Sequence, residues 1–522
     1  MSYRLAFGVA LFLVGFVVTG RTQHDIAGVV DLAKRGELTA LRNAITAGGD
    51  VAAASSDGST ALLWASYRDD LEMARWLLTG NAPVNAANDL GVTPLWAASE
   101  NRSAQMVALL LENGADPNMA LLSGETAVMI AARAGSEEVV QVLANAGADL
   151  DRSATRGQTA LMWAAANYHA ATVKALLEHG ADVDAIEAWR GQTALMWAVA
   201  QNQGDAVDVL LRAGADPNAR STGGFTPILF AAREGYLDVI DRLVRAGANV
   251  DDVVPGSGMS ALVMSVYNAH YDFAKGLLDA GANPDAADNG WSALHQVVWT
   301  RRPNLGRNPP FPVPHGELDA FDLVRALADA GANLDIRQTK EPRDGNRNIL
   351  NRVGSTAFLQ AAKVADVEMM QFLADLGADP GITTEEGCTA LMAASGVGIW
   401  KIGENPGTNE EALSAVILAW ELGNDVNASD VNGDTALHGA IHRGAGNVVE
   451  FLVKQGANID TVNNKGWSAL SVAEGVFYPN TFNRHPELVA LLTELGADPG
   501  VGTRREVDLS PEERLARGQD QE

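Results

Sequence analysis

The chain has 522 residues, 47% of them hydrophobic, and a net charge of −27 at pH 7. This acidity argues against nucleic acid and anionic membrane surfaces as main partners, and it also keeps a long chain soluble. The single cysteine, Cys388, excludes an internal disulfide, a Cys-x-x-Cys-His haem attachment and an N-terminal lipobox.

The first segment carries one positive charge, Arg4, followed by an apolar run over residues 5–19. Such a run is typical of a secretory signal peptide and is shorter than the roughly 20 residues that a spanning helix needs. We expect residues 1–20 to be a signal peptide and the protein to be periplasmic or secreted. An exported chain with one cysteine fits a bacterial periplasm best. The alternative is an uncleaved segment that anchors the chain in the inner membrane.

A short motif then recurs through most of the chain: Gly-x-Thr/Ser, then Ala or Pro, then an apolar residue. Successive Thr/Ser positions are separated by 33, 33, 33, 34, 33, 34, 32, 64, 33, 46 and 33 residues. A period near 33 predicts a solenoid, because each unit is too small to bury its own apolar face and must stack on its neighbours. The Thr/Ser anchors are Thr60, Thr93, Thr126, Thr159, Thr193, Thr226, Ser260, Ser292, Thr356, Thr389, Thr435 and Ser468.

The residue types predict how each unit begins and ends. Thr or Ser before an apolar run is typical of a helix N-cap, and Pro94 and Pro227 are tolerated in a first helical turn. A second signature follows about 21 residues after each anchor, as in Gly180-Ala181-Asp182. A glycine in that place suits a left-handed helix end.

The two signatures, in phase over about residues 25–500, resemble the ankyrin repeat family, most clearly at residues 157–165 and 224–235. The resemblance implies an all-α solenoid of about 13 helix-turn-helix units with short β-hairpin turns. It also implies a non-enzymatic scaffold that binds another protein through a concave face formed by the hairpins and the first helices. Residues 25–299 are expected to be regular repeats, residues 300–499 repeats with inserted loops, and residues 500–522 a polar tail.

The spacing becomes irregular after residue 300. The usual 21 residues from anchor to closing glycine become 39, 34 and 28 in three units, and a further excess precedes Thr356. Inserted loops in solenoids often belong to a binding face. The first insert is rich in proline, and the second carries Arg337, Arg343 and Arg347. These arginines are either solvated loop residues paired with their neighbours or an anion-recognition patch.

Candidate partner-binding residues lie at the hairpin positions and at the seventh residue after the anchors. Large exposed aromatic side chains mark interaction sites, although these could instead pack on the nearby inserts. Trp64, Trp163 and Trp197, four residues after their anchors, are expected in the core. The candidate residues are Trp189, Phe225, Met259, Tyr267, Trp291 and Trp299, together with the three arginines above.

Catalytic motifs are missing: we find no phosphate loop, nucleophile elbow, His-Glu-x-x-His or cysteine pair. His438 and His442 could form a metal pair, but His438 occupies the histidine position of the family and a structural role is favoured. We therefore expect no enzyme activity, cofactor or metal, a protein partner, no nucleic acid, and a membrane only if the first segment is retained. The alternatives are a ligand-binding or enzymatic site built from the inserts at residues 300–353 and 396–411, and a membrane-tethered regulator.

Overall fold

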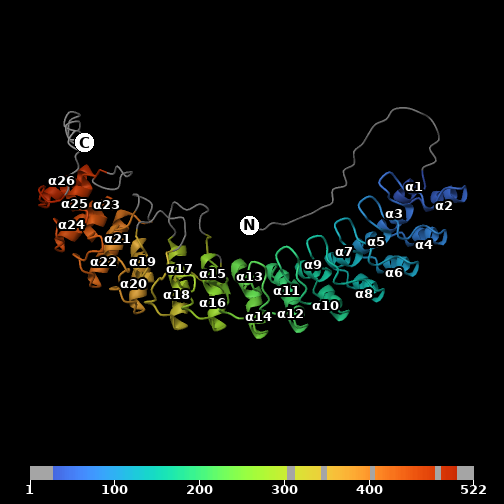
Figure 1. The fold of residues 1–522 in the computed structure, drawn as a ribbon, viewed down its shortest axis with the longest axis horizontal. Coiled ribbons are helices and arrows are strands. Elements are labelled where there is room, and N and C mark those ends of the chain that lie inside the picture. Colours follow the sequence, from blue (N-terminus) through green and yellow to red (C-terminus); the bar gives the residue numbers. More distant parts are fainter. Residues whose placement is uncertain are drawn as a thin grey trace, which may run out of the picture. The chain divides into compact units, whose positions relative to one another are not determined.

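The computed structural model describes residues 28–302, 312–314, 316–341, 350–399, 406–475 and 484–502. It divides into two compact units, Met1–Asp149 and Leu150–Glu522, and each is described by itself. In both units an odd-numbered first helix is followed by an even-numbered second helix. Within a unit, first helices contact first helices and second helices contact second helices, giving two layers (Figure 1).

The first unit holds four helix pairs within its described residues. They are α1 (Val29–Arg35), α2 (Leu38–Thr46), α3 (Ala61–Tyr67), α4 (Leu71–Thr79), α5 (Pro94–Glu100), α6 (Ala104–Glu112), α7 (Ala127–Ala134) and α8 (Glu137–Asn145).

The second unit holds nine helix pairs within its described residues, so the described parts of the two units contain 13 pairs, in agreement with the expected number of about 13 units. They are α9 (Ala160–Ala166), α10 (Ala170–Glu178), α11 (Ala194–Ala200), α12 (Gly204–Arg212), α13 (Pro227–Glu234), α14 (Ile240–Arg245) preceded by the 3-10 turn η1 (Leu237–Val239), α15 (Ala261–Tyr267), α16 (Tyr271–Asp279), α17 (Ala293–Arg301), α18 (Ala320–Asp329), α19 (Ala357–Lys363), α20 (Val367–Asp375), α21 (Ala390–Ser395), α22 (Asn409–Glu421), α23 (Ala436–Arg443), α24 (Gly446–Lys454), α25 (Ala469–Ala473) and α26 (Pro486–Glu494).

The anchors cap the first helices as predicted. The Thr93 hydroxyl accepts the Trp96 N–H at 3.1 Å, and the Ser260 hydroxyl accepts the Val263 N–H at 3.2 Å. Such a bond satisfies a backbone donor that the helix start leaves without a partner. Pro227 occupies the first turn of α13. The helical solenoid expected from the sequence is thus confirmed.

The hairpins contain little β-structure. Strands β1 (Val253–Val254) and β2 (Met259–Ser260) pair antiparallel, and elsewhere in the described residues isolated bridges such as Ser429 with Thr435 close the turn. The turns approach one another closely. Gly157 has a φ of +85°, and a Cβ there would collide with the backbone nitrogen of Ala188 in the next hairpin.

A ladder of side-chain hydrogen bonds joins consecutive repeats of the second unit. Asp184 accepts the Asp216 N–H at 3.0 Å, and Asn218 accepts the Asn249 N–H at 2.8 Å. The rungs continue with Asp251 to Asn283, Asp285 to Asn333, Asp335 to Asp379, Asn427 to Asn458 and Asp460 to Asp498. The ladder lacks one rung, because the residue that would accept the Asp425 N–H is Gly381, which has no side chain. At this joint the Asn424 side chain donates to the Pro380 carbonyl at 3.1 Å instead.

The prediction that Trp64, Trp163 and Trp197 lie in the core is wrong, because all three are half-buried. Residues four and seven after an anchor are three apart on one helix and therefore share a face. That face is turned away from the neighbouring helices, whereas the residues two and three after the anchor, such as Leu161 and Met162, are buried. The rings of Trp163 and Trp197 meet edge to face with their centres 6.0 Å apart.

Candidate functional site

The candidate surface, here called the hairpin face, lies in the second unit. It consists of the hairpin turns and of the first-helix residues four and seven positions after each N-cap. Phe225, Met259 and Trp291 each stand directly before an N-cap residue, and Tyr267 and Trp299 stand seven residues after one. All five are half-buried, whereas Trp189, in the turn before α11, is exposed over 62% of its surface.

Two arginines flank Trp189. The Arg190 guanidinium lies 4.2 Å from the centre of the Trp189 ring, and that of Arg156, from the preceding hairpin, lies 5.6 Å from it. A cation at such distances is attracted by the electron-rich ring face. The indole is therefore held between two consecutive hairpins while most of its surface remains open.

Glu187 organises the turn that carries Trp189. Its carboxylate is only 2% exposed and accepts the N–H groups of Trp189 and Arg190, each at 2.6 Å. A third donor, the Gln192 N–H, lies 3.4 Å away. Because these backbone donors offset the desolvation of the carboxylate, Glu187 fixes the positions of Trp189 and Arg190.

Phe225 belongs to a separate local group. Its ring centre lies 5.5 Å from that of Phe230, and the Arg233 guanidinium lies 5.7 Å from it. Arg233 also pairs with Glu234 at 2.8 Å. The predicted contact residues thus lie on one face but pack in distinct clusters along it.

Trp299 is covered by the chain itself. The Arg352 guanidinium lies 4.6 Å from its ring centre and pairs with Glu341 at 2.5 Å. The Trp291 ring lies edge to face with Trp299 at 6.1 Å, and its N–H donates to Gln296 at 3.1 Å. For Trp299 the alternative interpretation, packing against an insert, describes the contact with Arg352, whereas Trp291 contacts two residues of α17.

Arg337 is also engaged within the chain. Its guanidinium donates to the carbonyl oxygens of Gly354 and Thr383, both at 2.9 Å. It therefore ties its own hairpin to the next one. Arg343 and Arg347 lie outside the described residues, so the proposed anion patch stays a prediction for them.

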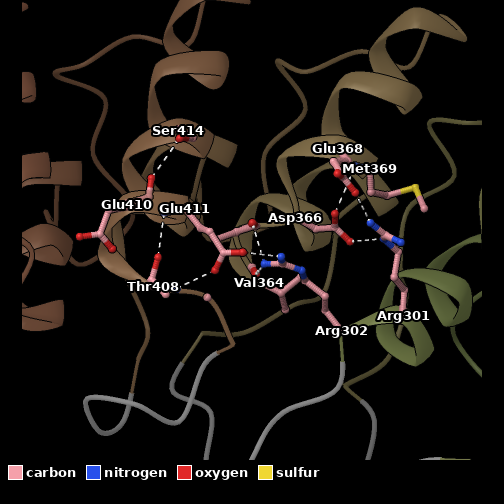
Figure 2. Close-up of polar contacts among 12 residues, drawn as sticks. Arg301, Arg302, Val364, Asp366, Glu368, Met369, Thr408, Glu410, Glu411 and Ser414 are labelled. Atoms are coloured by element: carbon pink, nitrogen blue, oxygen red, sulfur yellow. Dashed lines mark hydrogen bonds and ion pairs between the residues drawn. The ribbon is translucent and has the colours of Figure 1, made fainter. Parts of the chain in front are cut away.

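A network of arginines and carboxylates joins the start of the first insert to the next two repeats (Figure 2). Arg301 pairs with Asp366 at 2.8 Å and Glu368 at 2.6 Å, while Arg302 pairs with Glu411 at 2.6 Å. The hydrogen bond from Arg302 lowers the pKa of Glu411 below its usual range. Glu411 also accepts the Thr408 N–H at 2.8 Å and completes a capping box at the start of α22.

A small cavity of about 60 Å³ lies between residues of both inserts. It is lined by Leu350 and residues 396–399, and on the other side by Asp430, Asp434 and Trp467. Burial raises the pKa of Asp430. Ligand pockets usually measure about 300–1,000 Å³, so this cavity is too small for a drug-sized molecule.

A hollow of about 430 Å³ lies elsewhere, lined by Tyr168, Asp238 and Arg242, among others.

The two histidines at this cavity bind protein atoms. His438 accepts the Thr435 N–H at its Nδ1 and donates from its Nε2 to the Trp467 carbonyl at 2.9 Å. The Nε2 of His442 hydrogen-bonds with the Ile399 carbonyl at 2.7 Å, and burial lowers its pKa. Across the residues that the structure describes, no group of three or more potential ligands could hold a metal ion.

Sequence reasoning missed two features of this region. The partial exposure of Trp163 and Trp197 on the hairpin face was predictable, because each lies three residues before a predicted contact position on the same helix. The Arg302–Glu411 pair joins residues 109 positions apart, and nothing in the repeat period indicates it.

Residues 1–20 lie outside the described part of the chain, and within the described part no helix is long and apolar enough to cross a membrane.

Comparison with known proteins agrees with the repeat signatures. A family profile described as ankyrin repeats (3 copies) matches residues 30–121, 128–221, 195–288, 228–305 and 407–503, more than half of the chain. Ankyrin repeat and SOCS box protein 16 of Homo sapiens is 34% identical over 218 residues, which are 41% of this chain and 42% of that protein. The B-cell lymphoma 3 protein homolog of Mus musculus is 33% identical over 185 residues, 34% of each chain.

A search of solved structures gives a related match. The ankyrin repeat domain of Bcl-3, a member of the IkappaB protein family, is 31% identical, with a TM-score of 0.37, and the match covers 40% of this chain and 94% of that one. The chain spans less than half the length of the two full-length relatives above.

Proposed function

Because the chain belongs to the ankyrin repeat family, we propose that it is a non-enzymatic scaffold that binds another protein through its hairpin face and C-terminal inserts. Ankyrin repeats generally mediate protein–protein interaction. The division into regular repeats over residues 25–299 and insert-bearing repeats over residues 300–499 is part of this proposal. So is the absence of nucleic acid among the partners, which rests on the net charge of −27.

The exposure of Trp189 carries the proposal. An indole that is 62% exposed costs solubility unless a partner covers it, and tryptophan is among the residues that contribute most to binding at interfaces. Trp189 stands on a turn fixed by the Glu187 carboxylate, so little conformational entropy is lost when a partner binds. Trp291 and Trp299 give weaker support for partner binding, because both are half-buried and Arg352 of the same chain lies against Trp299.

The test is an affinity capture from the native organism with three tagged chains: wild type, Trp189→Ser and Tyr168→Ser. Tyr168 is also an exposed aromatic residue, but it follows the end of α9, away from the hairpin turns. We expect at least one protein to be recovered by the wild type and by Tyr168→Ser and to be lost with Trp189→Ser. The proposal fails if no recovered protein depends on Trp189 while all three chains melt at the same temperature.

The alternative of a ligand-binding or enzymatic site at the inserts has one observation in its favour, the cavity lined by Leu350 and residues 396–399. Its volume of about 60 Å³ suits a water molecule or a small side-chain group better than a substrate. We therefore favour the scaffold over an enzyme.

We also propose that the protein is exported, with residues 1–20 as a cleavable signal peptide and a bacterial periplasm as its compartment. The apolar run over residues 5–19 supports this proposal, and a membrane-tethered regulator remains the alternative. Mass spectrometry of the mature N-terminus separates the two. A chain that begins near residue 21 supports cleavage, whereas an intact first segment in the membrane fraction supports the tether.

A further inference from the structure

We infer that the partner segment bound at Trp189 is acidic and is recognised by the Arg156 and Arg190 guanidinium groups on either hairpin. This inference rests on the proposed function, since it names the chemistry of the partner at the same surface. The four residues that carry it, Arg156, Arg190, Trp189 and Ile186, are called the arginine–tryptophan ridge.

The two guanidinium groups of the ridge are available for a partner. Both are directed at the Trp189 ring, at 5.6 Å and 4.2 Å. Within the part of the chain that the structure describes, neither forms an ion pair with a carboxylate, whereas Arg220 on the next hairpin pairs with Asp252. A guanidinium group held near a ring keeps its N–H donors, which can meet a carboxylate in a bidentate manner.

The acidic residues near the ridge have their carboxylates occupied. Glu187 is buried and accepts three backbone N–H groups. Asp151 and Asp184, at the bases of the two hairpins, accept the N–H groups of Asp182 and Asp216 in the inter-repeat ladder. These bonds do not cancel the carboxylate charges, but they direct them to backbone donors, and within the described residues both guanidinium groups of the ridge stay without an ion-pair partner. On a chain whose net charge is −27, two such guanidinium groups offer an acidic segment the opposite charges that most of the surface lacks.

The apolar residues of the ridge indicate that the partner segment also carries an apolar side chain. Ile186 is 66% exposed in the same turn as Trp189. Together they offer an apolar contact beside two carboxylate-binding groups. The fitting partner is a protein segment in which Asp or Glu residues flank an apolar or aromatic side chain. A single-stranded nucleic acid could also stack on an indole beside arginines, and the test includes it.

The first experiment is a selection of displayed random short peptides on the immobilised full chain, with the Trp189→Ser chain as counter-selection. We expect peptides that depend on Trp189 to be enriched in Asp and Glu and depleted of Lys and Arg. Enriched peptides that depend on Trp189 but are neutral or basic overturn the acidic-partner inference and leave the proposed function standing. If no enrichment depends on Trp189, both fail.

The second experiment measures the best enriched peptide by fluorescence anisotropy. The double variant Arg156→Gln/Arg190→Gln is expected to weaken binding at least about tenfold, because each change removes a charge-assisted hydrogen bond. The matched control, Arg212→Gln/Arg245→Gln, removes two exposed arginines from second helices and is expected to change binding less than about twofold. Equal loss in both variants, or tighter Trp189-dependent binding of a single-stranded DNA oligonucleotide, overturns the inference.

Discussion

Arg352 and Trp299 belong to neighbouring repeats, and the guanidinium of the first lies 4.6 Å from the ring centre of the second. Arg352 is 1% exposed, whereas the side chain of its ion-pair partner Glu341 is 41% exposed. The pair is therefore asymmetric: one charge has lost its water and the other has kept part of it. This asymmetry gives the first prediction.

Glu341→Gln is expected to destabilise the chain more than Arg352→Met. The first change leaves a buried guanidinium without its counter-charge and should cost roughly 3 kcal/mol, while the second removes the buried charge, keeps an apolar side chain against the ring and should cost about 1 kcal/mol. Urea unfolding followed by tryptophan fluorescence measures both. The reverse order would mean that the cation–ring contact outweighs the ion pair.

Trp163→Ala should cost about 1–2 kcal/mol rather than the roughly 3–5 kcal/mol of a fully buried tryptophan, because the ring is half-buried. The edge-to-face contact with Trp197 should appear as a coupling of roughly 0.5–1.5 kcal/mol in a double-mutant cycle with Trp197→Ala. Purely additive losses in urea melts would show that the two rings do not stabilise each other.

Thr159→Val should cost roughly 1 kcal/mol, because it removes the hydroxyl that accepts the Met162 N–H at 3.4 Å. Thr159→Ser keeps this acceptor and serves as the control, with an expected loss below about 0.5 kcal/mol. Thermal melts of the three chains measure the difference. If Thr159→Val costs no more than Thr159→Ser, the cap bond does not contribute the expected stability.

His295 should make the stability of the chain fall in mild acid. Burial lowers its pKa to about 4, while its side chain in the unfolded chain titrates near 6.5. The unfolded state therefore binds the proton first, so stability is full above pH 6.5 and decreases as the pH falls toward 4, by roughly 3 kcal/mol at the lower end.

The measurement is a series of urea melts between pH 7.5 and pH 4 on the wild type and on His295→Gln, with the exposed His179→Gln as control. The His295→Gln chain should lose part of this pH dependence, and the control should retain it. The same slope in all three chains would assign the acid sensitivity to other groups. Because Nδ1 of His295 accepts the Ser292 N–H, His295→Gln is expected to lower stability at pH 7.5 as well.

The regular part of the fold could be predicted because its physics is local. Thr93 caps its own helix three residues on, and a repeat of such short-range signals fixes the number and order of the helices. The offset of Trp163 from the contact positions is also local, and its exposure was predictable from helix geometry. For these repeats the prediction was wrong about the burial of Trp64, Trp163 and Trp197, because the helical face that carries them was assigned to the core.

The covering of Trp299 and the network at Arg302 could not be predicted in the same way. Arg352 reaches Trp299 from a hairpin of irregular length, and Glu411 lies 109 residues from Arg302. Neither separation is a multiple of the period, because inserts shift the register between repeats. Side-chain partners across such inserts depend on the path of the loops, which composition and spacing do not specify.

The missing rung at Gly381 has a mechanical consequence. At all the remaining joints from Asp151 to Asp498, a side chain of one repeat accepts a backbone N–H of the next. A pulling force along the second unit therefore acts on the same kind of bond at each of these joints. At Gly381 this kind of bond is replaced by the one from the Asn424 amide to the Pro380 carbonyl, and the Arg302–Glu411 pair spans the same joint. Under tension, the joint between α20 and α22 would therefore rely on the arginine–carboxylate network and the Asn424 amide, where the other joints of the second unit rely on the ladder.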